Sequence, residues 1–286
     1  MSLYVTYAAP GRNRGPHGHF RQMRGYTVSP DVAKRRMVRL ALLIIVGTFA
    51  GIARPADIAP ADESRARSIV EKADEVRFPR EGFEVQVSIA STSDDGTTEA
   101  RKYRILSKGG QNTIFAVLEP ASERGQMMLM KARDLWVYMP NLSQPVRLSL
   151  SQRLTGQVAN GDLARANLSG DYNPTILRTE TVDGEPMIVL ELTAVDRAVT
   201  YHRVLYWVRE ANNRPYKAEF YSLSDRLLKT CRYLDYKTLG GKMRPTRLVM
   251  EDALQKGDTS VLEYREMRMR DLPDKVFTKD YLKHLD

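Results

Sequence analysis

The sequence predicts an α+β fold in which a curled antiparallel sheet, a half-barrel of about 11 strands, carries short helices on its concave side. Three observations support this prediction. Apolar residues alternate with polar ones through most of the chain after Gly82, as in strands with one buried face. Turn sequences such as Asp94-Asp95-Gly96 and Gly240-Gly241 separate the runs, and one amphipathic helix precedes them. A meander this long should curl, because large twisted sheets do not stay flat.

The first 61 residues resemble a targeting segment. Residues 1–36 are rich in Gly, Arg, Tyr and Pro without a repeat, so they are either a disordered leader or the result of a mis-assigned start upstream of Met37. Residues 37–61 follow the order of a secretory signal peptide: basic residues, an apolar run at 40–53, and an A-x-A site at Ala59-Pro60-Ala61. The alternative is an uncleaved membrane anchor, although the run is short for a span of about 20 residues. We expect a periplasmic protein whose single domain covers residues 62–286.

The first helix is predicted at residues 62–76. Asp62 and Glu63 stand at its N-terminus, where the helix dipole favours acidic residues, and Pro79 follows its end. Its apolar positions form one stripe at helical spacing: Ala66, Ile69, Val70, Ala73 and Val76.

Strands follow the helix in hairpin succession. In the first of them, apolar residues at every second position from Phe83 to Ile89 predict one buried face. Further strands are predicted at residues 101–107, 113–118, 146–150, 175–182, 187–193, 203–209, 216–223, 228–236, 246–254 and 259–268, and a last short helix at 279–285.

The stretch QMMLMKARDLWVYMP at residues 126–140 predicts a strongly apolar hairpin. If Arg133 and Asp134 form its turn, Leu129 faces Tyr138 across the pair and Lys131 faces Trp136. One face then holds Met127, Leu129, Lys131, Trp136 and Tyr138, and the other holds Met128, Met130, Ala132, Leu135, Val137 and Met139. A slip of one residue would exchange the faces, so this assignment depends on the turn.

Residues 151–172 interrupt the strand pattern. They contain Gly156, Gly161 and Gly170 and fit neither a strand nor one long helix. We expect two short helices, around Leu154 and between Leu163 and Leu168, that lie over the sheet. A connection of this length often serves as a lid or binding loop.

Composition excludes several functions. The formal net charge of the 286-residue chain is +9, but residues 1–61 contain nine of the 44 basic and two of the 35 acidic residues. The remaining 35 basic and 33 acidic residues nearly cancel, which argues against a nucleic-acid partner. The single cysteine, Cys231, can form neither an internal disulfide nor a thiolate metal site.

The sequence also lacks a recognisable catalytic motif. His202 and His284 have no metal ligands at the usual spacing, and no serine stands in a nucleophile-elbow sequence. Asp162 and Asp171 could form a carboxylate pair, but such residues more often cap short helices. We therefore predict no catalytic residue, no cofactor and no metal.

The residues around the hairpin resemble a known family. The strand Leu135-Trp136-Val137-Tyr138-Met139-Pro140 is followed by Gly156, by Asp162-Leu163 and by Asp171-Tyr172. This order is similar to that of the LolA/LolB-like superfamily, and most similar to its outer membrane lipoprotein-sorting proteins, over roughly residues 62–286. The chain has GQVANGDL where that family often has a more aromatic run, so its lid is less aromatic.

The resemblance implies a half-barrel whose concave side, covered by helices, holds acyl chains in an apolar cavity. Trp136 and Tyr138 are assigned to outer packing or docking, or to the cavity if the register slips. Leu154, Leu163 and Leu168 are assigned to the lid. The alternative for Met128 and Met130 is an ordinary packed core. The predicted cavity residues are Phe83, Val85, Val87, Ile89, Met128, Met130, Leu135, Val137 and Met139.

The resulting functional hypothesis is a periplasmic carrier that takes the acyl chains of lipoproteins or lipids toward the outer membrane. Its partners would be an inner-membrane transporter and an outer-membrane acceptor, and the carrier would be a monomer. One alternative is a periplasmic interaction module of an envelope export complex. A weaker one is a lipid-cleaving enzyme.

Overall fold

The computed structural model describes residues 60–284 except residue 166. The predicted leader at 1–36 lies outside this range. The predicted signal peptide at 37–61 and its A-x-A site also lie outside it, apart from the backbone of their last two residues. Over the part of the chain that is described, no helix is both long enough and apolar enough to cross a membrane.

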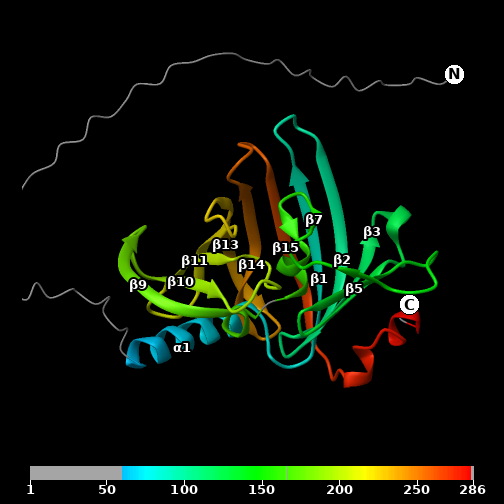
Figure 1. Cartoon of the computed structure of the whole chain (residues 1–286), viewed down its shortest axis with the longest axis horizontal. Coiled ribbons are helices and arrows are strands. Elements are labelled where there is room, and N and C mark those ends of the chain that lie inside the picture. Colours follow the sequence, from blue (N-terminus) through cyan, green and yellow to red (C-terminus); the bar gives the residue numbers. More distant parts are fainter. Residues whose placement is uncertain (1–59, 166, 285–286) are drawn as a thin grey trace, which may run out of the picture. The chain divides into compact units, whose positions relative to one another are not determined.

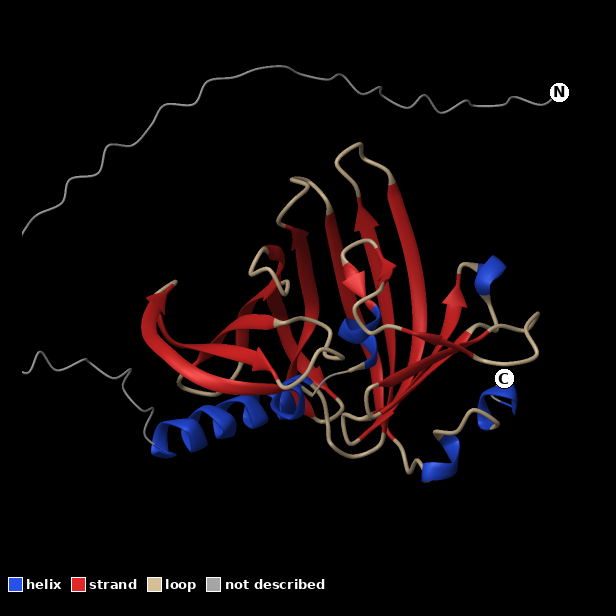
Figure 2. Cartoon of the chain, viewed as in Figure 1, coloured by secondary structure: helices blue, strands red, loops and turns tan. Residues whose placement is uncertain are grey.

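One antiparallel sheet dominates the fold (Figures 1 and 2). It contains 13 strands in the order β6-β5-β4-β3-β2-β1-β15-β14-β13-β12-β11-β10-β9, and a separate two-stranded sheet pairs β7 with β8. The predicted curled antiparallel sheet with short helices is thus confirmed, with 13 strands in place of about 11. The strands are β1 (Phe83–Thr92), β2 (Thr98–Lys108), β3 (Asn112–Glu119), β4 (Met127–Lys131), β5 (Asp134–Tyr138), β6 (Val146–Leu148), β7 (Arg153–Thr155), β8 (Val158–Ala159), β9 (Tyr172–Val182), β10 (Glu185–Ala194), β11 (Arg203–Arg209), β12 (Pro215–Tyr221), β13 (Leu227–Leu239), β14 (Lys242–Asp252) and β15 (Thr259–Met269).

The helices are few and short apart from the first. Predicted at residues 62–76, α1 extends from Pro60 to Arg77 and packs against β9, β12 and β14. Thr278 accepts a hydrogen bond from the backbone N–H of Tyr281 at 3.3 Å, so it caps the last helical turn as its sequence position suggests. The helices are α1 (Pro60–Arg77), η1 (Ala121–Glu123), α2 (Asn160–Ala164), α3 (Leu168–Asp171), η2 (Asp274–Val276) and η3 (Tyr281–His284).

The order of the strands explains why residues 149–171 cover the sheet. The chain enters the sheet in its middle at β1 and proceeds by hairpins to one edge at β6. It then reaches the opposite edge at β9 and returns by hairpins to β15, which pairs with β1. The connection from β6 to β9 must therefore cross the whole sheet, and β7, β8, α2 and α3 form during that crossing (Figure 1).

The apolar hairpin forms as β4 and β5, but its register differs from the prediction. Ala132 and Arg133 are the turn residues, so Leu129 pairs with Trp136 and Met127 with Tyr138. Ala132 takes the left-handed conformation, with φ of 54°, that such two-residue turns require. The shift is by two residues, so every side chain keeps its predicted face.

The prediction of a helix around Leu154 was wrong. Leu154 lies on β7, which forms a short hairpin with β8. The helix expected between Leu163 and Leu168 is divided into α2 and α3. Gly156 explains the hairpin: its φ is +49°, which favours glycine, and it leaves room for Ser91 and Ser260 beneath it.

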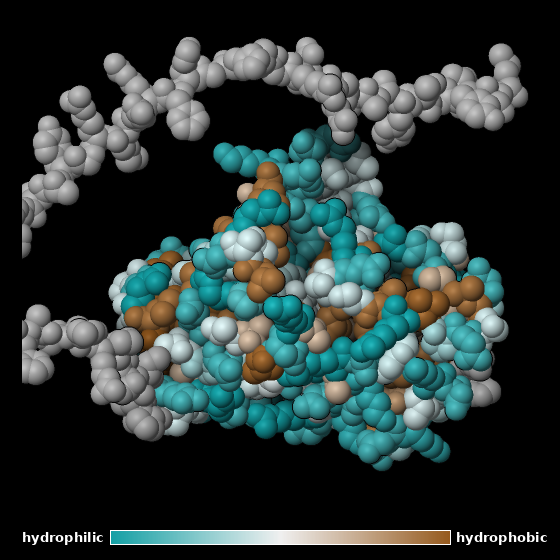
Figure 3. Space-filling model, in the orientation of Figure 1, coloured by the Kyte–Doolittle hydropathy of each residue, from teal (hydrophilic) through white to brown (hydrophobic). Residues whose placement is uncertain are grey.

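Apolar side chains are buried on both faces of the sheet. The inner face and the elements that cover it form the largest core cluster, which includes residues of α1, α2 and nearly every strand of the sheet. A second cluster lies on the other face, where Leu272, Val276, Phe277 and Leu282 of the C-terminal segment pack on β2 to β5. Exposed large apolar residues are scattered, so brown areas alternate with teal ones on the face in Figure 3.

Candidate functional site: the covered inner face of the sheet

The structure brings the predicted cavity residues together. Eight of them are buried, each at most 6% exposed, and Met139 packs against them while partly buried. They come from β1, β4 and β5 and share the inner core cluster. The eight buried residues are Phe83, Val85, Val87, Ile89, Met128, Met130, Leu135 and Val137.

The two aromatic residues of the hairpin lie on the other face. Trp136 and Tyr138 are partly buried and pack against the C-terminal cluster. The Lys279 ammonium lies 4.2 Å from the centre of the Trp136 ring, a distance typical of a cation–π contact. Both aromatics thus belong to the outer packing and not to the inner face.

The covering segment, residues 151–171, contributes apolar side chains to the inner cluster. Leu163 of α2 is 7% exposed, and Leu154 and Leu168 pack against the cluster while partly buried. The backbone of the β7–β8 hairpin rests directly on the sheet. A Cβ added at Gly156 would lie 2.1 Å from the Ser91 hydroxyl oxygen, which is too close for any side chain.

A buried ion pair holds the middle of the covering segment. Lys229 of β13 donates from Nζ to an Asp162 carboxylate oxygen at 2.5 Å and to the Gln157 carbonyl at 2.5 Å. The Tyr201 hydroxyl donates to the same carboxylate at 2.9 Å. The side chains of Lys229 and Asp162 are each only 6% exposed, so the pair is shielded from water.

A second network holds the end of the segment. The Asp171 carboxylate accepts hydrogen bonds from Arg165 at 2.6 Å and from Arg133, in the turn of the apolar hairpin, at 3.0 Å. On the other side, Asp74 of α1 accepts a hydrogen bond from the backbone N–H of Ser169 at 2.8 Å. The segment is therefore fixed to both α1 and the β4–β5 turn.

These contacts decide the role of the two carboxylates considered for catalysis. Asp162 accepts from the backbone N–H of Ala159 at 2.8 Å and so caps α2, in addition to its contacts with Lys229 and Tyr201. Asp171 forms ion pairs with Arg133 and Arg165. Both therefore act as anchors of the covering segment, and each already holds its cationic partner.

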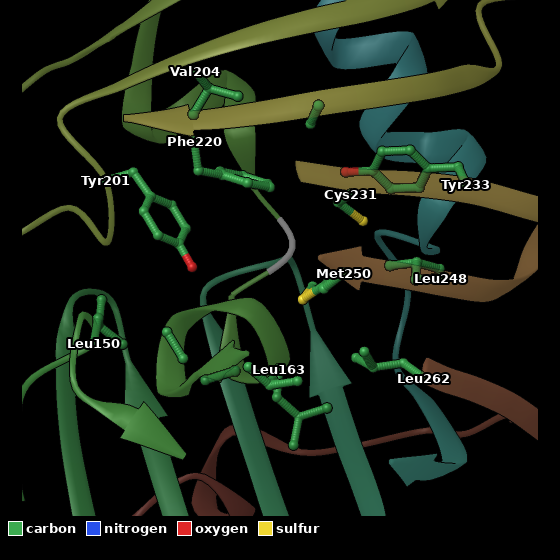
Figure 4. Packing of buried hydrophobic residues seen from close by; sticks show 14 of the residues in the cluster. Leu150, Leu163, Tyr201, Val204, Phe220, Cys231, Tyr233, Leu248, Met250 and Leu262 are labelled. Atoms are coloured by element: carbon green, nitrogen blue, oxygen red, sulfur yellow. The ribbon is translucent and has the colours of Figure 1, made fainter. Parts of the chain in front are cut away.

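A small pocket remains between the covering segment and strands β12 to β14. Its volume is about 40 Å³, and its walls include Arg77, Tyr201, Phe220, Tyr233, Leu248 and Met250. Figure 4 shows Phe220, Cys231 and Met250 on neighbouring strands around this space, with the Tyr201 hydroxyl directed toward the covering segment. Burial raises the pKa of Cys231 to about 12 and that of the Tyr233 hydroxyl well above its usual value, so both stay protonated at neutral pH.

Arg77 and Asp74 form a second buried ion pair at the end of α1. Their closest oxygen and nitrogen atoms are 3.6 Å apart, and the side chains are 9% and 11% exposed. Burial raises the pKa of Asp74 to about 6, although Arg77 and the hydrogen bonds from Ser169 oppose the shift. Asp74 Oδ1 and Arg77 Nη1 have no hydrogen-bond partner among the described residues.

The outer face has a larger pocket. It has a volume of about 320 Å³ and is lined mainly by apolar residues of β2, β3 and β4, with Arg104 and Arg124 at its border. Leu106, Ile114 and Met127 contribute to both this pocket and the outer core cluster.

The sites combine apolar surface with a few buried charges. The only cysteine is buried and protonated, and His202 is exposed on the surface. Within residues 60–284 there is no group of three or more His, Cys, Asp or Glu side chains placed to hold a metal ion. An apolar interior, a covering segment and a few buried charges together suit the enclosure of an amphiphile.

Fold and site define the class: an antiparallel half-barrel with a segment that covers its apolar inner face. A LolA superfamily protein from Nitrosomonas europaea is 62% identical, with a TM-score of 0.73, over 76% of this chain and 98% of that one. The chain belongs to the LolA superfamily.

Two more distant structures share the fold. A domain from Vibrio parahaemolyticus, named for a proposed role in outer membrane lipoprotein sorting, is 22% identical with a TM-score of 0.67 over 77% of this chain and 99% of that one. A protein from Desulfovibrio piger is 21% identical with a TM-score of 0.66 over 77% and 99% of the two chains. A family model that carries the description "Uncharacterized protein" matches residues 109–284. No curated protein matches the chain.

Sequence reasoning missed the charged and aromatic residues of the inner face. From the sequence, Arg77 at the end of the first helix is expected to be a solvated cation. Lys229 lies in a strand with an ordinary pattern of apolar and polar residues. The sequence did contain a signal for some of the aromatic residues of the inner face. Tyr201, Phe220, Tyr233 and Met250 fall on the inward positions of their strands or beside them, where aromatic and methionine side chains recur.

Proposed function

We propose that this protein is a periplasmic carrier that encloses the acyl chains of lipids or lipoproteins between the sheet and residues 151–171. The single observation that carries the proposal is the inner core cluster, in which apolar side chains from both ends of the sheet meet beneath one crossing segment. Membership of the LolA superfamily supports the same role.

Energetics make such a carrier feasible. Each buried methylene contributes about 0.8 kcal/mol, so a 16-carbon chain removed from water gains on the order of 12 kcal/mol. A membrane offers a similar gain, so the carrier must release its cargo by burying it incompletely. The pocket of about 40 Å³ is too small for such a chain, and loading therefore requires the covering segment to move off the sheet.

The anchors of the covering segment suit that movement. Besides the apolar contacts of the segment, they include hydrogen bonds and ion pairs, namely Lys229 with Asp162, Arg133 with Asp171, and Asp74 with the backbone of Ser169. When the segment lifts, water can replace these hydrogen-bond partners. Breaking such contacts therefore costs less free energy than exposing an equal area of apolar surface with no acyl chain bound. The arriving acyl chain then covers the exposed inner face.

Location and partners follow from the same proposal. A signal peptide at residues 37–61 would deliver the chain to the periplasm, and superfamily membership supports that compartment. Cargo would come from an inner-membrane transporter and go to an outer-membrane acceptor, with the carrier acting as a monomer. The predicted contacts of the acyl chain remain the inner residues of β1, β4 and β5, joined by Phe220, Leu248 and Met250.

Extraction of the purified protein with organic solvent, followed by mass spectrometry, tests the proposal. We expect bound lipid in the wild type and its loss in Met250→Trp, because an indole at this 3% exposed position would fill the pocket. Met243→Trp, on the same strand but 40% exposed, is the matched control and should keep its lipid. A wild type that carries no lipid and takes up no labelled fatty acid would contradict the proposal.

One observation favours a second function. The interior is densely filled, whereas the outer pocket is about eight times larger, at about 320 Å³ against 40 Å³. A periplasmic interaction module that docks through this outer pocket would need no cargo. In that case Leu118→Glu, at the border of the outer pocket, should abolish cross-linking to an envelope partner without changing the lipid content. A carrier should instead respond to Met250→Trp.

Catalysis on lipids is the weakest alternative, because Asp162 and Asp171 are both held in ion pairs. Phospholipid turnover that disappears in Asp162→Asn would support it.

A further inference from the structure

Arg77 is a buried cation whose hydrogen-bonding capacity is not used. Its side chain is only 9% exposed, it borders the interior pocket, and its Nη1 atom has no hydrogen-bond acceptor within the described part of the chain. Asp74 is near enough for electrostatic attraction, at 3.6 Å, but too far for a hydrogen bond. A guanidinium carries five donors, and leaving one of them buried and unpaired is costly.

The three most deeply buried cations of the described residues, Lys229, Arg165 and Arg244, are already satisfied. Lys229 binds Asp162 and the Gln157 carbonyl, and Arg165 binds Asp171 and the Ala132 carbonyl. Arg244 donates to the carbonyl groups of residues 75, 76 and 239, and thereby caps the C-terminus of α1. Of the two arginines that line the interior pocket, Arg77 alone has a donor to offer a ligand.

The surroundings of Arg77 are amphiphilic. Its guanidinium carbon lies 5.8 Å from the ring centres of both Phe78 and Tyr233. The Tyr206 hydroxyl, also buried, lacks a hydrogen-bond partner among the described residues. Leu248 and Met250 continue the pocket wall with apolar surface. The pocket therefore offers one unpaired positive charge beside hydrocarbon surface. The other charged groups in its wall are already paired, Asp162 with Lys229 and Asp171 with Arg165.

We propose that Arg77 binds the anionic head group, a carboxylate or a phosphate, of an amphiphile whose chain lies on the inner face. This inference rests on the proposed carrier function and specifies the chemistry of its cargo. Arginine suits this role because its planar guanidinium group can donate two parallel hydrogen bonds to either anion. A neutral chain in the same place would leave the guanidinium against hydrocarbon, so anionic amphiphiles should be preferred over neutral ones of equal length.

Asp74 gives the site a way to accept the anion. When a ligand carboxylate or phosphate contacts Arg77, it also approaches the Asp74 carboxylate, and two negative charges at that distance repel each other. The raised pKa of Asp74, about 6, means that this group takes up a proton at little cost near neutral pH. Replacement of Asp74 by Asn should therefore help the anion to bind.

Paired probes that differ only in charge test the proposal. Dansyl-labelled undecanoic acid and its methyl ester are titrated into the purified protein, with dansyl fluorescence as the readout. We expect the wild type to bind the acid at least about 10-fold more tightly than the ester, as for a hydrogen-bonded charge pair. Arg77→Met should reduce this ratio to about 2 or less, and Asp74→Asn should raise the affinity for the acid several-fold at about pH 7.5.

The control is Arg104→Met, because Arg104 lines the outer pocket described above and also a second pocket beside Leu272 and Val276 of the C-terminal segment. This variant therefore reports binding on the outer face. This variant should keep the wild-type ratio. Competition with dodecanoate and with dodecyl phosphate then identifies the preferred anion, and a clear effect of either supports the site.

Two results would overturn the inference while leaving the carrier function intact: equal affinity of the wild type for acid and ester, or a preference that survives Arg77→Met but is lost in Arg104→Met. The comparison of acid and ester uses the wild type alone, so it remains decisive even if Arg77→Met does not fold. Binding of neither probe would instead contradict the carrier function itself.

Discussion

The two halves of the inner face differ in what they bury. On β1 to β5 the buried side chains are aliphatic residues, methionines and three aromatics, with a few serine and threonine hydroxyls, and none of the buried charged residues lies on these strands. On β11 to β14 the inner face buries Tyr206, Tyr233, Cys231 and Lys229, and α1 adds Arg77 and Asp74 beside them.

The covering elements explain this difference. The first half meets the β7–β8 hairpin and α2, which approach the sheet closely through Gly156 and Leu163. The second half meets α1, whose C-terminal turn carries charged residues into the interior. Under the proposed carrier function, the first half would contact the hydrocarbon chain and the second half the polar head group.

The largest effect is expected in the aliphatic half. Met130→Asp places a carboxylate at a fully buried position next to Leu135, and no buried cation on β1 to β5 can pair with it. We expect the free energy of unfolding to fall by more than about 4 kcal/mol, as measured by urea denaturation. Lys131→Gln, an exposed change on the same strand, should cost less than about 0.5 kcal/mol. A small loss for Met130→Asp would mean that this half already tolerates charge.

The next effect concerns the buried pair of the polar half. Lys229→Met leaves the Asp162 carboxylate buried without its cation, so we expect a loss of about 3 to 4 kcal/mol in urea denaturation. Combining it with Asp162→Asn should recover at least about 1 kcal/mol, because the buried charge is then removed as well. Arg232→Met, on the same strand but in a half-exposed pair with Glu251, serves as the control and should cost below about 1 kcal/mol.

A smaller effect is the pH dependence that Asp74 imposes. The pKa of this buried group is raised from 3.8 to about 6 in the folded state, so the native protein holds the proton more tightly than the unfolded chain. Its contribution to stability is thus present below about pH 4 and is lost as the pH rises to about 6, a change of about 2 to 3 kcal/mol. Urea unfolding at several pH values should show a shallower decline in Asp74→Asn over this range. Identical slopes in the two proteins would show that Asp74 does not titrate as described.

The smallest effect is expected in a measurement of solvent access to the polar half. The buried Cys231, with its pKa raised to about 12, should react with iodoacetamide at least about 100-fold more slowly in the folded protein than in urea. Asp162→Asn should increase the rate, because it weakens the anchor that keeps the covering segment closed. Equal rates in the wild type and this variant would mean that the segment opens without breaking the Lys229 contact.

Most of the fold could be predicted because it follows from local patterns. Alternation from Phe83 to Ile89 defined β1, and the stripe from Ala66 to Val76 defined α1. The hairpin faces were also correct, since a register error of two residues preserves the side on which each side chain lies. The β7 strand was missed because three residues are too few to show a period.

The sequence by itself determined the strands of the large sheet, the first helix and the apolar set on β1, β4 and β5, because each depends on the spacing of neighbouring residues. Only the tertiary structure decided that α1 carries Arg77 to the inner side of β13, and that Lys229 meets Asp162 from 67 residues away. A cation at the end of a helix is solvated in most proteins. Its burial here depends on how α1 and the segment that crosses between the two sheet edges pack together, and no local pattern contains that information.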